Sequence, residues 1–392
     1  MTKHYDIIII GSGISAISAI KAIREIDQVK SVLLISNEDR LPYKRTKINK
    51  MMDIGFQKED FKLFPYNYYK ENNITLIYDE VISVHTDINT IYSKTDNFSY
   101  FQLLIATGKK PRHLNFSNIP KDRIYNIYTA RDAETLIDQS KLHSSYLVIG
   151  GGVEGLEMTD QLLKMGKMVH LVHNSDFLMD KQITKNISDI IKDTCTKHGV
   201  NVLTDQHVEN HLSYQNNKII YTINNEQLYF DAIIECIGSE PNCSFLENSR
   251  ININHGIIVD KQLKTSVANV YAAGDVAVLP DHKNSYLWHA AEAQGYVAGK
   301  NILGENIEYQ YKPFRLKCDI LGTYIFSHNK PLKFKEHKIV VEKNNNLYRE
   351  IFIKDDKIIG IVMLNDKERS KMYEKCVWEQ WTLELLNKHL AF

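Results

Sequence analysis

The chain has 392 residues, with 48 basic and 48 acidic side chains and a formal net charge of zero. That length predicts two or three domains, and the balanced charge, without a long run of one sign, argues against nucleic-acid binding. No apolar stretch approaches the roughly 18 residues of a membrane span, so we expect no association with a membrane.

The first predicted strand, Tyr5–Ile10, is a run of apolar, mostly β-branched residues of the kind buried on both faces of a parallel sheet. It leads into Gly11–Ala16, which fits the G-x-G-x-x-G/A fingerprint, and then into isoleucines at helical spacing. The glycines allow a tight turn and let a pyrophosphate meet the free N–H groups of the helix. After a second strand, Val32–Ile35, Glu38 occupies the place of a ribose-binding acid.

The same plan recurs further along the chain. The strand Tyr146–Ile149 precedes the glycine-rich Gly150–Gly155, and leucines at helical spacing follow. One such fingerprint is weak evidence, because isolated glycine triplets are more often structural turns. Two in order, each between a strand and a helix, predict two bound dinucleotides.

The second copy departs from the plan at its ribose site. Its second strand, Val169–Val172, ends in His173 and not in an acid. A carboxylate there would bind the ribose hydroxyl and repel a 2′-phosphate, whereas histidine removes the repulsion and is able to donate a hydrogen bond to phosphate. Alternatively, Asn174 or a backbone group binds the hydroxyl. The choice between NADH and NADPH therefore stays open.

The order of elements predicts an α/β fold with two Rossmann-like dinucleotide-binding domains, the second inserted into the first, and a small C-terminal α+β domain. In the last domain, short strands at Leu347–Ile353 and Ile358–Leu364 precede a helix expected from Lys371 to Leu390. The expected boundaries are 1–112 with 236–309 for the first domain, 113–235 for the second, and 310–392 for the third.

The positions of the cysteines indicate the cellular compartment of the protein and limit the ways in which it is able to transfer electrons. The five are scattered without a C-x-x-C pair, which predicts free thiols in a reducing cytoplasm, and Met1–Tyr5 leave no room for a secretory signal. From Met1 to Thr194 there is no cysteine, so a thiol relay on the first helix is excluded. The histidines form no H-E-x-x-H motif or comparable cluster, and we expect no metal site.

Several further segments carry a family resemblance. Leu41–Lys50 is similar to a P-Y-x-R-x-x-L-S-K motif, and four later segments match other landmarks in the right order: Ala106–Gly108, Gly238–Asn242, Ala273–Asp275 and Trp288–Gly295. Together they resemble the FAD-dependent pyridine nucleotide reductase family, in the branch of rubredoxin and ferredoxin reductases and the flavin portion of NAD(P)H nitrite reductase. Thr46, Lys47 and Asn49 depart from the motif.

The resemblance, which covers nearly the whole chain, implies FAD as the first dinucleotide and NADH or NADPH as the second. It places Arg45 near the FAD pyrophosphate and Asp275 on the ribityl chain, and it makes Lys50 and Glu157 an ion pair beside flavin N5, with catalytic roles. A helix starting near Ala290 would direct its positive end at the flavin. The expected cofactor-binding residues are Gly11, Gly13, Ser15, Ala16, Glu38, Arg45, Lys50, Ala106, Thr107, Gly108, Gly150, Gly152, Val153, Glu154, Gly155, His173, Gly238, Gly274, Asp275 and Trp288.

Three functions are compatible with these features. The favoured one is a reductase that takes hydride from NAD(P)H onto FAD and passes electrons to a separate small carrier protein of the rubredoxin or ferredoxin type. The alternatives are a flavin-dependent redox sensor or binding protein, and an NAD(P)H oxidase that reduces oxygen. We expect a monomer or a homodimer.

Overall fold

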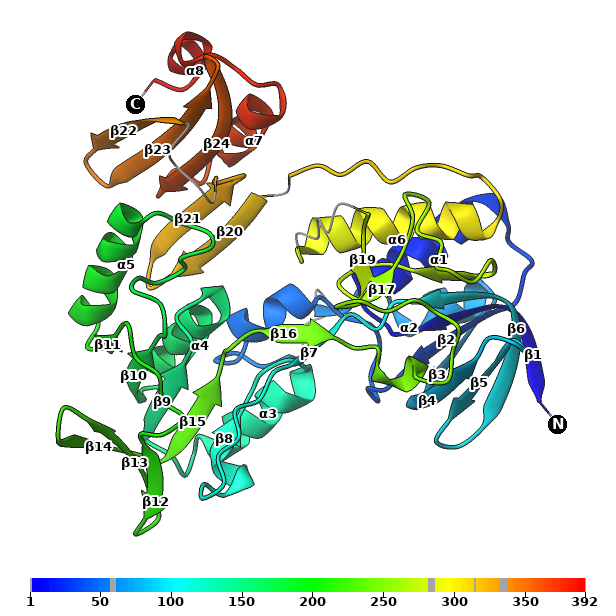
Figure 1. The fold of residues 1–392 in the computed structure, drawn as a ribbon, viewed down its shortest axis with the longest axis horizontal. Helices are drawn as coiled ribbons and strands as arrows, with labels where there is room; N and C mark the ends of the chain where they lie inside the picture. The colour runs from blue at the N-terminus through cyan, green and yellow to red at the C-terminus, as the bar shows by residue number, and fades with distance from the viewer. Residues whose placement is uncertain (1, 57–60, 281–285, 314, 332–336, 392) are drawn as a thin grey trace. The chain divides into compact units, whose positions relative to one another are not determined.

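A computed structural model describes residues 2–56, 61–280, 286–313, 315–331 and 337–391 (Figure 1). The chain forms two compact units. The first unit consists of Met1–Lys47, Phe56–Pro111 and Ser239–Lys312, and the second of Ile48–Gly55, Arg112–Gly238 and Pro313–Phe392.

The first unit is built on a seven-stranded sheet of order β3-β2-β1-β6-β5-β4, with β18 paired to β6. Its central strands run parallel and are buried because they are almost wholly apolar; the four isoleucines that end β1 are at most 4% exposed. Ile10 pairs with both Ile35 and Ile105, so three strands end at the same edge of the sheet. The strands are β1 (Lys3–Ile10), β2 (Val32–Ser36), β3 (Ile74–Tyr78), β4 (Val81–His85), β5 (Thr90–Ser93), β6 (Asn97–Ile105) and β18 (Val270–Ala272).

Two helices of this unit, α1 and α6, cross at small residues. A Cβ on Gly295 would lie 2.1 Å from the carbonyl oxygen of Ser15, and one on Gly299 would lie 2.4 Å from that of Ala19. Only glycine permits this approach, which holds α6 close to α1. The remaining elements are α1 (Ile14–Ile26), α2 (Tyr66–Glu71), α6 (Trp288–Ile302), β7 (Lys109–Pro111), β16 (Ser239–Pro241), β17 (Ile257–Ile258), β19 (Ala277–Val278) and the 3₁₀ helices η1 (Arg45–Lys50), whose last residues belong to the second unit, and η4 (Ser244–Leu246).

The second unit contains a parallel sheet of order β11-β10-β9-β15-β8 and a separate antiparallel sheet, β12-β13-β14. Ile149 pairs with Val172, as Ile10 pairs with Ile35 in the first unit, so the two parallel sheets repeat the same register. The elements are α3 (Ala130–Gln139), α4 (Val153–Lys164), α5 (Lys185–Lys197), β8 (Ile124–Tyr125), β9 (Ser145–Ile149), β10 (Met168–Val172), β11 (Asn201–Leu203), β12 (Leu212–Gln215), β13 (Lys218–Ile223), β14 (Glu226–Phe230), β15 (Ala232–Glu235) and the 3₁₀ helix η3 (Lys121–Arg123).

The C-terminal part of the second unit is an antiparallel sheet of order β20-β21-β24-β23-β22, which packs on α4 through β20 (Figure 1). Asp355 and Asp356, both with positive φ, form the tight turn between β23 and β24. Its elements are β20 (Arg315–Ile320), β21 (Thr323–His328), β22 (Lys338–Asn344), β23 (Leu347–Lys354), β24 (Lys357–Leu364), α7 (Ser370–Trp378) and α8 (Leu383–His389).

The helix predicted from Lys371 to Leu390 is wrong in one respect, because α7 and α8 are separate helices. Gln380 between them has a φ of +52°, which ends the right-handed path. The hydroxyl of Thr382 then accepts a hydrogen bond from the N–H of Leu385, at 3.2 Å, and caps α8. The predicted fold class, two Rossmann-like sheets with a C-terminal α+β part, is confirmed.

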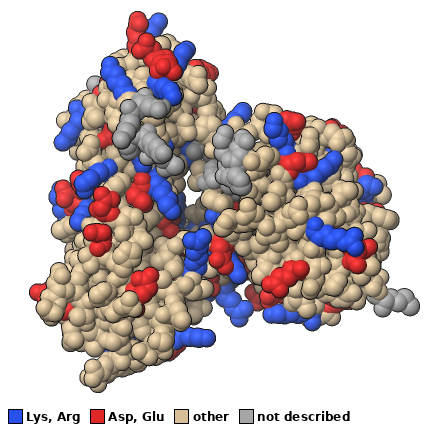
Figure 2. Space-filling model, in the orientation of Figure 1, with Lys and Arg blue, Asp and Glu red and all other residues tan. Residues whose placement is uncertain are grey.

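On the face drawn in Figure 2, basic and acidic side chains are interspersed within each unit. None of the helices in the described part of the chain combines the length and the apolar character that a bilayer crossing requires.

Candidate functional site

The first glycine-rich turn leaves an open cradle at the start of α1. Gly11 has a φ of +99°, and a Cβ on it would lie 2.4 Å from the carbonyl oxygen of Ala106, so this position requires glycine. At Gly13, the N-cap of α1, a Cβ would meet nothing within 4 Å, and no side chain caps the helix. The N–H groups of the first turn thus have no side-chain cap, and the space beside Gly13 is open, which together suit a pyrophosphate.

Glu38, Tyr43 and Arg45 form one cluster beyond β2. The Tyr43 hydroxyl donates to a carboxylate oxygen of Glu38 at 2.7 Å, and the Arg45 guanidinium pairs with the other oxygen. Glu38 is only 9% exposed. The structure thus brings together the residues expected at the ribose and at the phosphate, and the carboxylate is held in a fixed orientation.

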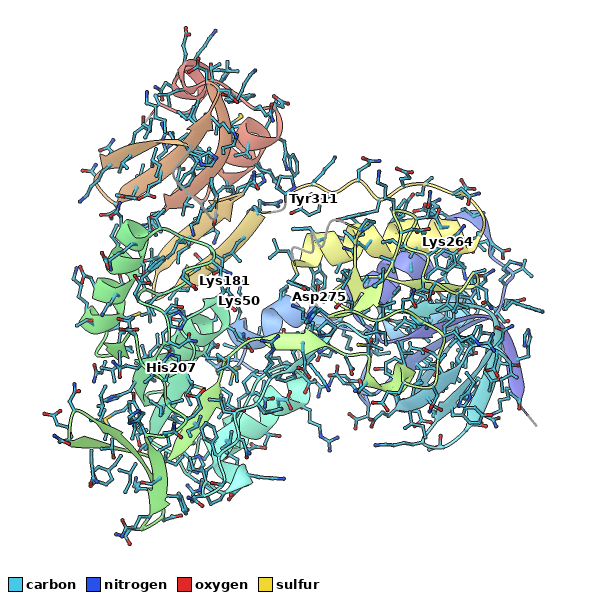
Figure 3. The ribbon with its side chains drawn as sticks, viewed as in Figure 1. Lys50, Lys181, His207, Lys264, Asp275 and Tyr311 are labelled. Carbon is cyan, nitrogen blue, oxygen red and sulfur yellow. The ribbon has the colours of Figure 1, made fainter. Side chains whose placement is uncertain are left out.

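Gly274 and Asp275 follow β18 at the carboxyl edge of the sheet, and Figure 3 labels Asp275 there. The N–H of Gly274 donates to the side chain of Gln294 at 2.8 Å, and a Cβ on Gly274 would lie 2.7 Å from the Ser15 hydroxyl. Burial raises the pKa of Asp275, and the nearby Lys109 opposes this rise. Gln294, which the sequence prediction did not single out, therefore anchors this loop to α6.

Two other segments predicted to bind the cofactor contact each other in the first unit. The Thr107 hydroxyl donates to the carbonyl of Asn242 at 2.6 Å, and the N–H of Asn242 donates to the carbonyl of Gly108 at 2.9 Å, next to the β7–β16 pair. Trp288 is the first residue of α6 and is half-buried. In the second unit, Gly238 has a φ of +92° and accepts from the N–H of Arg112.

The second glycine-rich turn repeats the cradle. A Cβ on Gly150, whose φ is +113°, would lie 2.1 Å from the carbonyl oxygen of Cys236. A Cβ on Gly155 would lie 1.8 Å from the carbonyl of Gly150, which explains why the helix requires glycine there. Gly152, the N-cap before Val153, has open space around its Cβ position and no side-chain cap. The residues fit a second pyrophosphate.

His173 lies directly against this turn. Its Nδ1 accepts a hydrogen bond from the N–H of Gly151 at 3.1 Å, and a Cβ on Gly151 would lie 2.8 Å from the imidazole. Nε2 is 3.9 Å from a carboxylate oxygen of Asp180. Burial lowers the pKa of His173, so the ring is neutral and its proton is on Nε2.

Lys50 and Glu157 form an ion pair in the second unit, with 3.5 Å between the Lys50 ammonium and a Glu157 carboxylate oxygen (Figure 3 labels Lys50). The Asn49 side-chain amide also reaches Glu157, at 3.5 Å. Burial raises the pKa of Glu157, and Lys50 opposes this rise. The structure therefore brings the two predicted catalytic residues together, and Asn49, which departs from the family motif, contacts the same carboxylate.

Two thiols near this pair are held in their neutral form. Burial raises the pKa of Cys318 to about 12, with Glu157 adding to the rise, and raises that of Cys236 well above its usual range. All five cysteines are free. A thiol must ionise to act as a nucleophile, so these two are poor electron relays. Among the described residues, no group of three or more His, Cys, Asp and Glu side chains is arranged to hold a metal ion.

Glu154 provides a pH-dependent prediction. Burial raises its pKa from 4.5 to about 7, with Glu157 adding to the rise. Between these values the folded state binds more protons than the unfolded state, so Glu154 makes the free energy of unfolding fall as pH rises. We expect Glu154→Gln to be about 1–3 kcal/mol more stable than the wild type above pH 7, and equally stable below pH 4.5. Urea unfolding at both pH values measures this.

The control is Glu226→Gln, which removes an exposed carboxylate from β14 and is expected to change stability equally little at both pH values. An equal effect of Glu154→Gln at both pH values would contradict the prediction.

A protein-family model described as pyridine nucleotide-disulphide oxidoreductase matches residues 5–295. The chain therefore belongs to the pyridine nucleotide-disulphide oxidoreductase family. A second model, described as the rubredoxin NAD+ reductase C-terminal domain, matches residues 317–381 of this oxidoreductase. These matches confirm the predicted resemblance, the assignment as an oxidoreductase, and FAD with a nicotinamide dinucleotide as cofactors.

Two relatives illustrate the range of the family. The chain is 26% identical over 368 residues to nitrite reductase [NAD(P)H] of Bacillus subtilis, covering 92% of this chain but only 45% of that protein. It is 24% identical over 377 residues to NADH-rubredoxin oxidoreductase of Clostridium acetobutylicum, covering 96% and 95%. The crystal structure of the clostridial protein superposes with a TM-score of 0.82 at 23% identity, over 99% of this chain and all of that one, which shows the shared fold.

Proposed function

We propose that this protein takes hydride from NADH or NADPH onto FAD and passes the electrons singly to a small carrier protein of the rubredoxin or ferredoxin class. The observation that carries the proposal is the pair of open glycine cradles, at Gly13 and Gly152, in a chain without cysteine before Cys195. The near full-length similarity to NADH-rubredoxin oxidoreductase of C. acetobutylicum favours this class of acceptor.

Under this proposal, each of these residues has an expected role. Bound FAD supplies the ring that accepts hydride and releases electrons. The N–H groups after Gly13 hold its pyrophosphate, Arg45 adds positive charge there, and Glu38 accepts the ribose hydroxyls. Asp275 accepts from the ribityl chain. Lys50, oriented by Glu157, provides the positive charge that favours electron uptake.

The stoichiometry of the proposed reaction defines the assay. One NADH delivers a hydride, which carries two electrons, and two one-electron carriers accept them while one proton is released. We expect NADH-dependent reduction of rubredoxin or ferredoxin at two carriers per NADH, faster than oxygen is consumed in the absence of a carrier.

Two results would redirect the assignment. Oxygen consumption that matches NADH oxidation, whether or not a carrier is present, would identify an oxidase. Slow reduction followed by a persistent charge-transfer absorbance, without turnover by carriers or one-electron dyes, would identify a sensor.

The setting of the reaction follows from the same features. We place the protein in the cytoplasm, because all five cysteines are free thiols. We expect it to act as a monomer or a homodimer, and light scattering of the FAD-loaded protein distinguishes the two.

A further inference from the structure

The residue at the end of the second strand contacts the glycine-rich turn in both nucleotide-binding sheets. Ser36 and His173 occupy equivalent positions, because each follows the residue paired with the end of the first strand. The Ser36 hydroxyl is 2.9 Å from the Ser12 hydroxyl, and His173 Nδ1 accepts from the N–H of Gly151 at 3.1 Å. His173 is therefore engaged with the protein and does not simply replace a ribose-binding acid.

Glu38, the acid of the first unit, follows Ser36 two positions along the chain. The N–H of Glu38 donates to the Ser36 hydroxyl at 3.2 Å, which directs the carboxylate to the end of β2. The residue of the second unit that corresponds to Glu38 is Ser175, and its hydroxyl donates to Asp180 at 3.3 Å. A carboxylate from further along the chain therefore reaches the place that an acid occupies in the first unit.

Backbone contacts hold Asp180 in this place. The N–H of Met179 donates to the carbonyl of Gly151 at 2.9 Å, which ties the segment to the glycine-rich turn. The Lys330 ammonium donates to the carbonyl of Asp180 at 2.8 Å, from the loop after β21. The Asp180 side chain is 34% exposed and remains accessible to a ligand.

We propose that Asp180 selects the nicotinamide dinucleotide, accepting the adenosine ribose hydroxyls of NADH and repelling the 2′-phosphate of NADPH. This inference rests on the proposed function. His173 Nε2, a buried atom without a hydrogen-bond partner among the described residues, lies 3.9 Å from Asp180 and places a neutral N–H beside this carboxylate. A full negative charge outweighs a neutral donor in the choice between hydroxyl and phosphate.

Lys181 is a positively charged residue that would oppose this role of Asp180. It follows Asp180, is exposed, and is labelled in Figure 3. If Lys181 bound a 2′-phosphate, NADP+ would bind well and Lys181→Ala would weaken NADP+ alone. The test therefore includes this variant.

The test is isothermal titration calorimetry of the FAD-loaded protein, which measures its affinity for NAD+ and for NADP+. We expect the wild type to bind NAD+ at least about 30-fold more tightly than NADP+, and Asp180→Asn to reduce this ratio to about threefold or less. The matched control is Asp176→Asn, which removes an exposed acid from the same loop and leaves the ratio unchanged. His173→Ala, which frees the glycine-rich turn, weakens both dinucleotides by a similar factor.

The inference is overturned if the wild type binds both dinucleotides equally, if Asp180→Asn leaves the ratio unchanged, or if Asp176→Asn lowers it as much. It is also overturned if the wild type binds NADP+ tightly and Lys181→Ala weakens the binding of NADP+ but not of NAD+. Failure of the wild type to bind either dinucleotide would refute the proposed function itself.

Discussion

Replacing Gly13 with valine is expected to remove FAD from a protein that still folds. Gly13 has a φ of −74° and open space around its Cβ position, so valine fits the backbone but fills the cradle before α1. The loss of charge-assisted hydrogen bonds from the first turn is expected to weaken FAD by about 100-fold. The intrinsic cost to folding is about 1 kcal/mol, because glycine is the better N-cap. Flavin absorbance per protein measures occupancy.

The contrasting variant is Gly11→Val, whose Cβ would lie 2.4 Å from the carbonyl oxygen of Ala106 and whose φ of +99° valine does not tolerate. We expect this variant to unfold at a much lower denaturant concentration than Gly13→Val, with both measured without FAD. Wild-type FAD affinity in Gly13→Val would show that the cradle is not the pyrophosphate site.

Replacing Lys50 with alanine is expected to slow flavin reduction by about 100-fold, the usual scale for removing one electrostatic group from a reacting centre. FAD content is expected to stay unchanged, because Lys50 acts on electron uptake and not on the pyrophosphate. Stopped-flow measurement of flavin bleaching by NADH tests this. Lys50→Arg keeps the charge and is expected to recover part of the rate.

Glu157 gives this prediction a pH signature. Burial raises the pKa of Glu157, so as pH falls this carboxylate becomes protonated at a higher pH than an exposed glutamate does. Once protonated, it no longer orients Lys50. The rate of flavin reduction in the wild type is therefore expected to fall at low pH. In Glu157→Gln this fall in rate is expected to disappear. Lys70→Ala, which removes an exposed lysine from α2, is the control and is expected to leave the rate unchanged. Equal rates for Lys50→Ala and the wild type would remove Lys50 from the mechanism.

The parts of the molecule that were predictable from sequence are those governed by local backbone physics. Apolar β-branched runs such as Tyr5–Ile10 became the buried strands, and Gly11 and Gly150 were needed because a positive φ and a close carbonyl admit no side chain. The two strands before the C-terminal helices were also correctly placed. These features follow from a few adjacent residues.

The parts that were missed depend on contacts between distant segments. Gln294 anchors Gly274, and Gly299 meets Ala19, through the packing of α6 on α1. Asp180 reaches the end of β10 only because its loop folds back on Gly151. The break at Gln380 lies in a segment with ordinary helical periodicity, and only the observed positive φ reveals it.

The most direct test of the electron path is an anaerobic titration of the FAD-loaded protein with NADH. A path without a redox-active disulfide stores one electron pair per FAD, so one equivalent of NADH is expected to bleach the flavin completely. A disulfide relay would store a second pair. Consumption of two equivalents per FAD, or no bleaching at all, would contradict the account.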